Sequence, residues 1–457
     1  MTEKLSCFLI RFFLIVFLLA HCLTAAIAQE APAAPRHKTR SKLWAGPVVG
    51  SVTAHSAKVW IAYSGTGKNA VILGDTATKR IFYPSNYSYT VSKKGIVSLT
   101  FEFNGLLPAH NYNVLVAIEG WKTSTKYSFS TQADTAVQDM RFLIGSCAML
   151  NTDFTRIAFP GFSSRIYTSM KKRKADFMVW LGDNVYYLLP YQYNSTEGMF
   201  KRNISVRRSF PLYRDFLNSS VNYAIWDDHD YGPNDSDSSW RLKDSALAVF
   251  KSFWPNTYPD QKQFPGNYFN FRYYDAEFFM LDDRYYRAPE GDTLAPFLGE
   301  TQLIWLKNKL LLSDAAFKFI AIGTQVLNEN AFGETYLHYA HERSELLNFI
   351  AANNIKGVVF LTGDKHYTEI CRRDWKGYPV YDITCSPLTS PVLPRWLFGA
   401  LNNPTRIPGS DYSHRNFGEI AITGAVGQRV CRIGIFNVRG KKKREIVIPQ
   451  SELQVKP

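Results

Sequence analysis

A short acidic stretch follows a run of apolar residues in the middle of the chain. WDDHDYGPND, residues 226–235, crowds four aspartates around His229, and VNYAI at 221–225 is typical of a buried strand. Carboxylates at this spacing repel one another and raise one another's pKa values unless a cation holds them. The stretch is therefore either an acidic turn or part of a metal site, and the rest of the chain has to decide between them.

Five apolar runs end in residues of this kind. A single Gly-Asp turn after a strand is ordinary turn chemistry. In layered α/β domains, however, ligands gather in the loops beyond the strand ends, so five such ends together favour a site. The five are RFLI before GSC (145–147), FMVWL before GDNVYY (182–187), NYAIW before DDHD (227–230), EFFML before DDRYYR (282–287) and VVFL before TGDKH (362–366).

The chemistry that this set predicts is metal-assisted hydrolysis. Two neighbouring cations can share a carboxylate, activate a water and neutralise charge on a phosphoryl oxygen. Aspartates suit hard cations, whereas a thiolate, an imidazole or a phenolate suits iron or zinc. Other catalytic signatures are lacking, because GFSSR (161–165) is not a nucleophile elbow and AHERSE (340–345) has no second zincin histidine.

The beginning of the chain is predicted to be a secretory signal. Residues 1–28 combine Lys4 and Arg11 with the apolar run FFLIVFLLA and end in the small residues AIA. An uncleaved anchor is the alternative, but the apolar run is short for a membrane span. Residues 29–43 are a Pro/Ala-rich basic linker, so the mature protein is expected in a periplasm, at a cell surface or outside the cell.

Residues 44–135 are predicted to form an N-terminal β-sandwich domain. Short β-like runs such as AKVWIAY, NAVIL, IVSLTFEF and NYNVLVAI alternate with Gly, Pro, Asn and Ser. The stretch LLPAHNY is similar to the turn of a fibronectin-type-III-like domain, with Tyr112 at its corner. QADTAVQD, residues 132–139, is the expected domain boundary.

Residues 138–457 are predicted to be an α/β layered domain. Apolar runs alternate there with longer segments of helical pattern: RIYTSMKKR, SALAVFKSFW, ETQLIWLKNKLLL and ERSELLNFIAAN. The formal net charge of the whole chain is +14, which favours anionic substrates or surfaces without identifying one. The densest basic run, RGKKKR at 439–444, lies between apolar runs, and we interpret it as a solvated hairpin turn rather than a binding patch.

The ordered series GSC, GDNVY, WDDHD, LDDRYYR and GDKH resembles that of the PhoD-like alkaline phosphatases, a branch of the calcineurin-like metallophosphoesterases. The resemblance covers essentially the mature chain. It implies a layered metallophosphoesterase-like β-sandwich flanked by helices, preceded by the small all-β domain. It also implies a metal centre of Fe3+ and Ca2+.

The resemblance assigns roles to particular residues. Asp183 would be the bridging carboxylate and a catalytic residue, and His229 would contact the substrate phosphate and protonate the leaving group. Cys147 takes the place of the superfamily's usual first ligands. The implied ligands are Cys147, Tyr186 and His366 for iron, with Asp228 and Asp364 joining Asp183 for the second cation.

Several neighbours keep alternatives open. Tyr186 is favoured over Tyr187 by its spacing from Asp183, and Asn184 is either a ligand or a turn former. Arg284, the third predicted catalytic residue, either clamps phosphate together with Arg287 or forms an ion pair with Asp282 or Asp283. Further expectations are that Asp227 and Asp230 orient the ligands, that Lys365 takes no part, that His338 and His341 are surface residues, that Cys385 is structural, and that Cys371 and Cys385 are free or paired.

The function predicted from the sequence is hydrolysis of phosphate mono- or diesters by a metal-bound hydroxide. One rival is a phosphodiesterase or phospholipase D-like enzyme that acts on phospholipid or on wall polymers. Another is an inactive envelope-binding protein, which the complete set of ligand positions disfavours. We expect a monomer with a phosphate-ester substrate, no nucleic-acid-binding motif and no membrane span after signal cleavage.

Overall fold

The computed structural model describes residues 41–65, 69–118, 124–135, 137–151, 164–259, 265–291, 294–330, 333–392 and 403–456. The predicted signal at 1–28 and the linker up to residue 40 lie outside the described residues. None of the helices in the described ranges has the length and apolar character needed to cross a bilayer.

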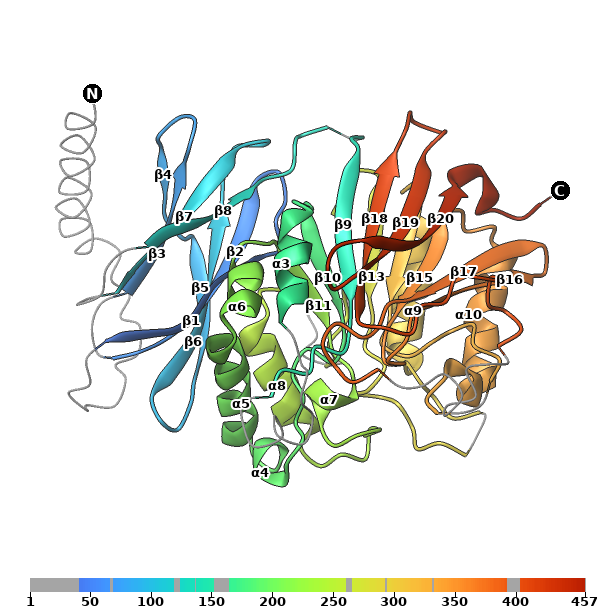
Figure 1. The fold of residues 1–457 in the computed structure, drawn as a ribbon, viewed down its shortest axis with the longest axis horizontal. Coiled ribbons are helices and arrows are strands. Elements are labelled where there is room, and N and C mark those ends of the chain that lie inside the picture. The colour runs from blue at the N-terminus through green and yellow to red at the C-terminus, as the bar shows by residue number, and fades with distance from the viewer. Residues whose placement is uncertain are drawn as a thin grey trace.

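The N-terminal region consists of two four-stranded antiparallel sheets (Figure 1). One sheet has the order β1-β2-β6-β5, and the other has the order β4-β3-β7-β8. The strands are β1 (Lys42–Gly50), β2 (Ser56–Ser64), β3 (Asn69–Asp75), β4 (Ile81–Phe82), β5 (Asn86–Val91), β6 (Ile96–Asn104), β7 (Asn111–Ile118) and β8 (Ser124–Ser130).

Two details compare directly with the sequence-based expectations for this region. Strand β1 begins at Lys42, so the last two residues assigned to the linker are already in the sheet. The corner expected at Tyr112 is present, because its hydroxyl accepts a hydrogen bond from the backbone N–H of Leu107 at 2.7 Å. Burial of the ring then fixes the turn between β6 and β7 against the core.

The larger region contains two six-stranded sheets. The first has the order β11-β10-β9-β18-β19-β20, and the second has the order β12-β13-β14-β15-β17-β16. The first sheet is built from β9 (Met140–Gly145), β10 (Phe177–Leu181), β11 (Asn222–Ile225), β18 (Asn416–Thr423), β19 (Val430–Asn437) and β20 (Lys442–Pro449). The second is built from β12 (Phe269–Tyr273), β13 (Ala276–Met280), β14 (Phe317–Ala321), β15 (Val358–Thr362), β16 (Glu369–Trp375) and β17 (Tyr378–Thr384).

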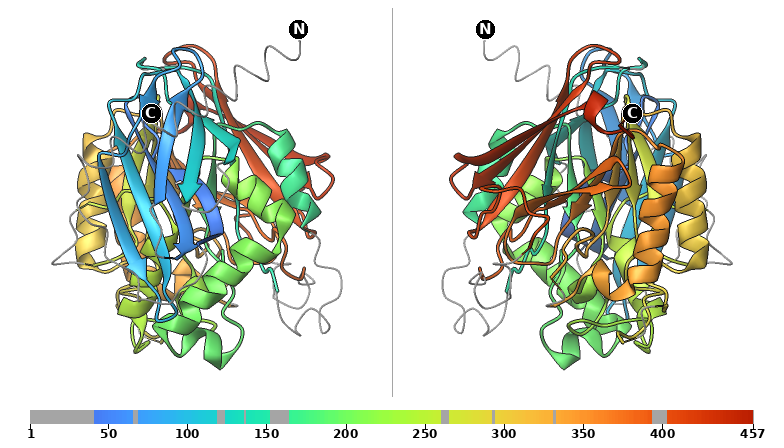
Figure 2. Two further views of the ribbon diagram at one scale, coloured as in Figure 1. Left: turned by 90° about the vertical axis from the view of Figure 1, so that its left-hand side faces the viewer. Right: turned by 90° about the vertical axis from the view of Figure 1, so that its right-hand side faces the viewer.

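Helices cover the outer faces of these two sheets. The end-on views show α9 and α10 on one side of the molecule and α3 on the other (Figure 2). The helices are α3 (Arg165–Lys172), α4 (Pro190–Tyr193), α5 (Thr196–Ser209), α6 (Pro211–Asn218), α7 (Asp228–Tyr231), α8 (Lys243–Phe253), α9 (Glu300–Leu312) and α10 (Ala340–Ala352), with 3-10 turns at Tyr336–Tyr339 and Gln450–Glu452. The four longer helices expected from sequence are α3, α8, α9 and α10.

Aromatic side chains join the inner faces of the two sheets. The ring of Phe142 on β9 lies 5.0 Å from that of Phe278 on β13 and 5.2 Å from that of Phe319 on β14. Each of these rings is fully buried, which contributes about 1.5–3 kcal/mol per side chain. The packing confirms a mixed α/β fold with a β-sandwich flanked by helices.

Candidate metal centre

The parallel neighbours β9 and β10 in one sheet, and β15 in the other, deliver polar residues at one edge of the sandwich. Four of these residues have positive φ, a conformation that is uncommon outside glycine: Cys147 (56°), Asp183 (55°), Asp364 (65°) and His366 (54°). Such conformations cost roughly 1–3 kcal/mol each and gather at functional sites. The turns therefore store strain where they aim these side chains.

Glycines allow the turns to approach one another. A Cβ added at Gly182 would lie 2.6 Å from the Cβ of Asp227, and one at Gly363 would lie 2.5 Å from the carbonyl oxygen of Leu181. Gly182 also has a φ of +88°. The Gly-Asp pairs seen in the sequence thus have a steric origin, since any side chain before Asp183 or Asp364 would push the strand ends apart.

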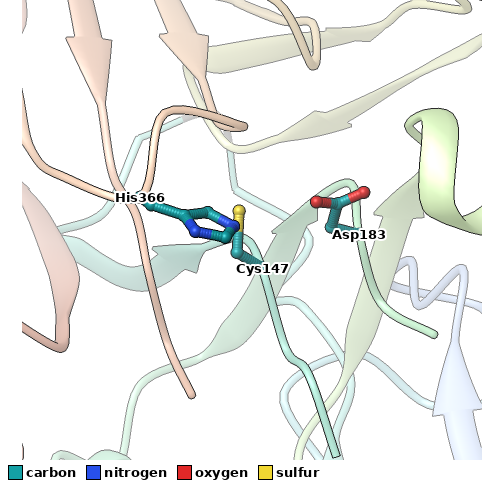
Figure 3. Close-up of side chains that lie close together, drawn as sticks. All are labelled: Cys147, Asp183 and His366. Atoms are coloured by element: carbon teal, nitrogen blue, oxygen red, sulfur yellow. The ribbon is translucent and has the colours of Figure 1, made fainter. Parts of the chain in front are cut away.

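The first cluster contains Cys147, Asp183 and His366, whose ligand atoms all lie within 4.8 Å of one another. Figure 3 shows the Cys147 sulfur between the His366 imidazole and the Asp183 carboxylate. Tyr186 joins them, because its hydroxyl lies 2.8 Å from Oδ2 of Asp183 and 3.2 Å from Nε2 of His366. The four residues predicted for the iron site are therefore together.

The second cluster contains Asp183, Asp228 and His229, again with all ligand atoms within 4.8 Å. The His229 ring stacks on Tyr186 with centroids 4.1 Å apart, and its backbone N–H lies 3.3 Å from Oδ1 of Asp183. Asp183 belongs to both clusters, which is the geometry a bridging carboxylate needs. His229, which the sequence assigned to the substrate phosphate, thus lies among the residues that could bind a metal.

The electrostatics of the two clusters favour added positive charge. Burial, together with the charges of Asp228 and Asp227, raises the pKa of Asp183 well above its usual value. Burial likewise raises the pKa of the Cys147 thiol. Burial lowers the pKa of His366 to about 4, so its imidazole is neutral at pH 7 and competent as a ligand.

Asp230 and Asp227 hold the site together, as the sequence predicted. The Asp230 carboxylate accepts hydrogen bonds from the backbone N–H groups of Asn184 (3.0 Å) and Val185 (2.9 Å). Its burial raises its pKa to about 7. Asp227 caps the N-terminus of the short helix α7, which carries Asp228 and His229. The two aspartates thereby fix the turn after β10 against the turn after β11.

Arg284 forms ion pairs, which was one of the two expected alternatives, but its shortest contacts are to Asp227 and Glu334, which the sequence did not indicate. Its guanidinium is fully buried, donates to Asp227 through Nε at 2.6 Å, and makes two hydrogen bonds to Glu334 at 2.8 and 2.6 Å. Asp283 lies only at the 4.0 Å limit. The expected pairing with Asp282 is wrong, because that carboxylate accepts hydrogen bonds from Trp226 and from two backbone N–H groups.

Arg287 is bound in the same way, with Glu334 at 2.7 Å and Glu290 at 2.9 Å. The two arginines therefore hold Glu334 between them beside Asp227 and Asp228, with which Glu334 forms a third acidic cluster. This geometry supports the ion-pair alternative for both arginines.

The remaining predicted residues lie at the edge of the sandwich, in the core or at the surface. Asp364 lies at the same edge but in none of the three clusters found among the described residues, and its carboxylate is 3.4 Å from the Lys365 ammonium. The Asn184 amide nitrogen donates to the Ile225 carbonyl and to Asp230, as a turn former does. Tyr187 is a core residue whose hydroxyl accepts from Asn203. His341 is exposed, and His338 is half-buried beside Glu290.

Sequence reasoning missed three residues near the centre. Ser386 donates to the Cys147 sulfur at 3.0 Å, and Ser390 donates to the Tyr186 hydroxyl at 2.9 Å. Both follow β17, in TCSPLTSP, which is a sixth strand end whose serines had no metal-ligand signature. Glu334 is not preceded by a strand, so no pattern indicated it.

All four cysteines in the described part of the chain are free and buried. Cys371 lies on β16, where the Asn403 amide donates to its sulfur at 3.1 Å, whereas Cys385 contacts the carbonyl of Ile144. The alternative in which Cys371 and Cys385 pair is therefore not what the structure contains, and Cys385 is structural as expected.

The donor set fits a metal centre. Buried atoms that face this edge without a hydrogen-bond partner among the described residues include Oδ2 of Asp227, Oδ1 of Asp228 and Nδ1 of His229. Buried polar atoms are rarely left unpaired unless a water or an ion completes them. Thiol, phenol and imidazole on one side of Asp183 and carboxylates on the other are suited to a softer and a harder cation.

Comparisons with known proteins agree with this geometry. The model of the PhoD-like phosphatase family matches residues 142–395, more than half of the chain. Alkaline phosphatase D of Bacillus subtilis (strain 168) is 26% identical over 249 residues, which cover 44% of this chain and 42% of that protein.

Two solved structures share the fold. A structure of PhoD superposes with a TM-score of 0.69 at 18% identity, covering 89% of this chain and 90% of that one. A purple acid phosphatase from yellow lupin (Lupinus luteus) seeds gives a TM-score of 0.63 at 11% identity, covering 88% and 74%. The family match begins within β9 and extends past Ser390. It therefore contains every residue of the candidate centre. The chain belongs to the PhoD-like phosphatase family.

Proposed function

We propose that this protein is an exported, metal-dependent phosphoesterase that hydrolyses phosphate mono- or diesters. The observation that carries the proposal is the position of Asp183 in two adjacent ligand clusters of different chemistry. A carboxylate shared in this way can hold two cations close together, which is the arrangement of two-metal phosphoester hydrolysis. Export rests on the signal-like pattern of residues 1–28.

The two sides of the centre suit different cations. Cys147, Tyr186 and His366 with Asp183 would hold Fe3+, and Asp228 and Asp364 with Asp183 would hold Ca2+. When bound, these cations would supply Lewis acidity, lowering the pKa of a water molecule and neutralising charge on the phosphoryl oxygens. Cation binding would also relieve the repulsion that raises the pKa of Asp183.

His229 is the residue placed to move a proton. Its ring is held by stacking on Tyr186 and its backbone by the hydrogen bond to Asp183, and its Nδ1 is without a partner among the described residues. An imidazole fixed at this edge can protonate the departing alkoxide of the ester. The same position also allows ligation, and the test below separates the two roles.

Arg284 acts as a positioning residue in this proposal. Bonds to Asp227 and Glu334 use both sides of its guanidinium, so it orients the acidic wall of the site instead of clamping the substrate. The fully buried arginine also offsets the charge of Asp228, whose pKa is lowered, despite burial, by His229 and Arg284.

The first experiment measures hydrolysis of p-nitrophenyl phosphate and bis-p-nitrophenyl phosphate by the mature protein, with and without EDTA. Activity abolished by EDTA and restored by iron plus calcium supports the proposal, and absence of turnover with both metals supplied contradicts it. His229→Ala should lower kcat while the bound metal content stays constant. Loss of metal along with activity would make His229 a ligand.

A spectroscopic test separates the two neighbouring tyrosines. A ferric ion bound to Tyr186 should give a visible tyrosinate-to-iron absorption band. Tyr186→Phe should abolish this band, whereas the matched variant Tyr187→Phe should keep it, since the Tyr187 hydroxyl is bound to Asn203 in the core. A band that survives Tyr186→Phe contradicts the iron assignment.

A second candidate, a phosphodiesterase acting on phospholipid or wall polymers, is favoured by the net charge of +14. Such substrates carry many negative charges, and a basic protein concentrates near them. Preference for the diester in the experiment above would support this candidate, and preference for the monoester would contradict it.

A further inference from the structure

A cavity with a basic lining lies at the same edge of the sandwich as the metal centre. It has a volume of about 440 Å³ and is lined by Arg415, Arg439, His414, Tyr412, Asn437, Val392 and Val438. No carboxylate occurs among these residues, although the neighbouring centre consists largely of carboxylates. A concave basic surface of this kind attracts anions.

The sheet register places this cavity at the edge that carries the centre. Strand β18 pairs with β9 so that Gly418 is opposite Ile144, and it pairs with β19 so that Asn416 is opposite Asn437. Since neighbouring strands lie about 4.8 Å apart, the end of β19 is roughly 10 Å from the end of β9, just before Cys147.

Hydrogen bonds connect the cavity wall to the ligands. Nε of Arg415 donates to the Ser390 carbonyl at 3.0 Å. The Ser390 hydroxyl donates to the Tyr186 hydroxyl and lies 2.9 Å from the Cys147 carbonyl oxygen. The cavity and the centre thus share the segment that contains Ser390, and a substrate bound at one is in reach of the other.

Arg439 belongs to RGKKKR, the basic run that the sequence indicated as a solvated turn. The run does form the hairpin between β19 and β20, and the Asn437 side chain caps it by accepting from the backbone N–H groups of Arg439 and Lys441. Lys442 is paired with Glu445, whereas Arg439 is exposed at the cavity. The turn therefore presents one of its cations toward the site.

We infer that this cavity binds a second phosphate group carried by the substrate, in addition to the phosphate that is hydrolysed at the metal centre. The inference rests on the proposed phosphoesterase function and narrows its substrates to esters with two or more phosphates. Guanidinium groups suit this ligand, because their N–H donors match phosphate oxygens in geometry and charge. Arg415 and Arg439 would contact the non-reacting phosphate.

The test compares two substrates that differ only by one phosphate. These are the 5′-p-nitrophenyl phosphate ester of thymidine and the same ester with a phosphate on its 3′-oxygen, assayed with the metal-loaded mature protein. We expect the second substrate to have a kcat/KM roughly tenfold higher, the size of one charge-assisted contact. Arg439→Gln should remove this preference while leaving turnover of the first substrate unchanged.

Arg432→Gln is the matched control, because Arg432 is an exposed arginine near the start of β19, the strand that leads into the turn with Arg439. It removes the same charge and should keep the preference. A parent protein that shows no preference, an Arg439→Gln variant that keeps it, or an Arg432→Gln variant that loses it equally would overturn the inference. Inhibition of the first substrate by inorganic phosphate that weakens in Arg439→Gln, without any preference for the second substrate, would mean that the cavity binds free phosphate, which also overturns it. If the parent turns over neither ester and neither p-nitrophenyl phosphate nor bis-p-nitrophenyl phosphate, the proposed function itself fails. A parent that hydrolyses those two simple substrates but neither thymidine ester overturns the inference alone.

Discussion

Two buried aspartates, Asp75 in the N-terminal β region and Asp183 at the sandwich edge, have opposite surroundings. Burial would raise the pKa of Asp75, but hydrogen bonds from the Thr78 hydroxyl, the Ala77 N–H and the His110 ring lower it to about 2. Asp183 is surrounded by further carboxylates, and its pKa is raised.

The polar groups around Asp75 find their hydrogen-bond partners within the chain, whereas several polar groups around Asp183 have none among the described residues. Neighbouring groups of the chain donate hydrogen bonds to the Asp75 carboxylate, so its charge stabilises the fold. Asp183 lacks enough donors, and the acids around it are costly to ionise without added cations. Asp75 therefore has a structural role, whereas the chain tolerates the charge at Asp183 for the sake of a ligand. The four predictions below test this contrast.

The largest effect is expected from Asp183→Asn. Loss of the shared carboxylate should lower kcat/KM by more than the roughly 10- to 100-fold typical for outer residues of a metal site. Metal content measured by elemental analysis should fall in parallel. Retention of both metals at parental stoichiometry would contradict the bridging role. Asp75→Asn is the matched control and should keep activity and metal.

Arg284→Met should be strongly destabilising. Removal of this buried cation leaves Asp227 without its partner and Glu334 with Arg287 alone, which costs about 3–5 kcal/mol of unfolding free energy. Added divalent cation should restore part of the loss, because the orphaned acids lie in the metal clusters.

The control for this prediction is Arg429→Met. Arg429 is equally buried but pairs with Asp139 and Asp275, away from the clusters. Its loss of stability, measured by chemical unfolding, should not respond to the cation. If both variants are rescued equally, or neither is, the acids beside Arg284 have no special affinity for metal.

Removal of metal should lower the melting temperature of the parent. At free cation concentrations a hundred times Kd, binding contributes about 2.7 kcal/mol to stability, which chelation removes. The metal-free Asp183→Asn variant should be at least as stable as the metal-free parent, because the substitution relieves like-charge repulsion. A metal-free variant clearly less stable than the parent would show that Asp183 already has adequate partners.

Much of the candidate metal centre was accessible from the sequence, and the missing parts have a physical explanation. Strand ends and Gly-Asp turns are local, so Cys147, Asp183, Asp228 and His366 were found from apolar runs and the residues after them. Glu334 and Ser390 come from loops whose position depends on the packing of the whole sandwich, so no local pattern marks them. The closest partners of Arg284, Asp227 and Glu334, were missed for the same reason, because they are distant in the sequence. The neighbouring Asp282 instead accepts a hydrogen bond from Trp226.

The smallest effect is expected from Asp75→Asn, and it should depend on pH. The folded pKa of about 2 lies below the usual aspartate pKa of 3.8, so the carboxylate contributes fully above about pH 4 and loses its contribution as the pH falls toward 2. Near pH 6 the substitution should cost about 1.5–3 kcal/mol, the range for hydrogen bonds to a charged group. Near pH 2 the parent has itself lost this stabilisation, and the two proteins should converge. Thermal unfolding of both across this range measures the difference directly. A difference independent of pH would mean that shape rather than charge makes Asp75 structural, and the contrast with Asp183 would then rest on the metal centre alone.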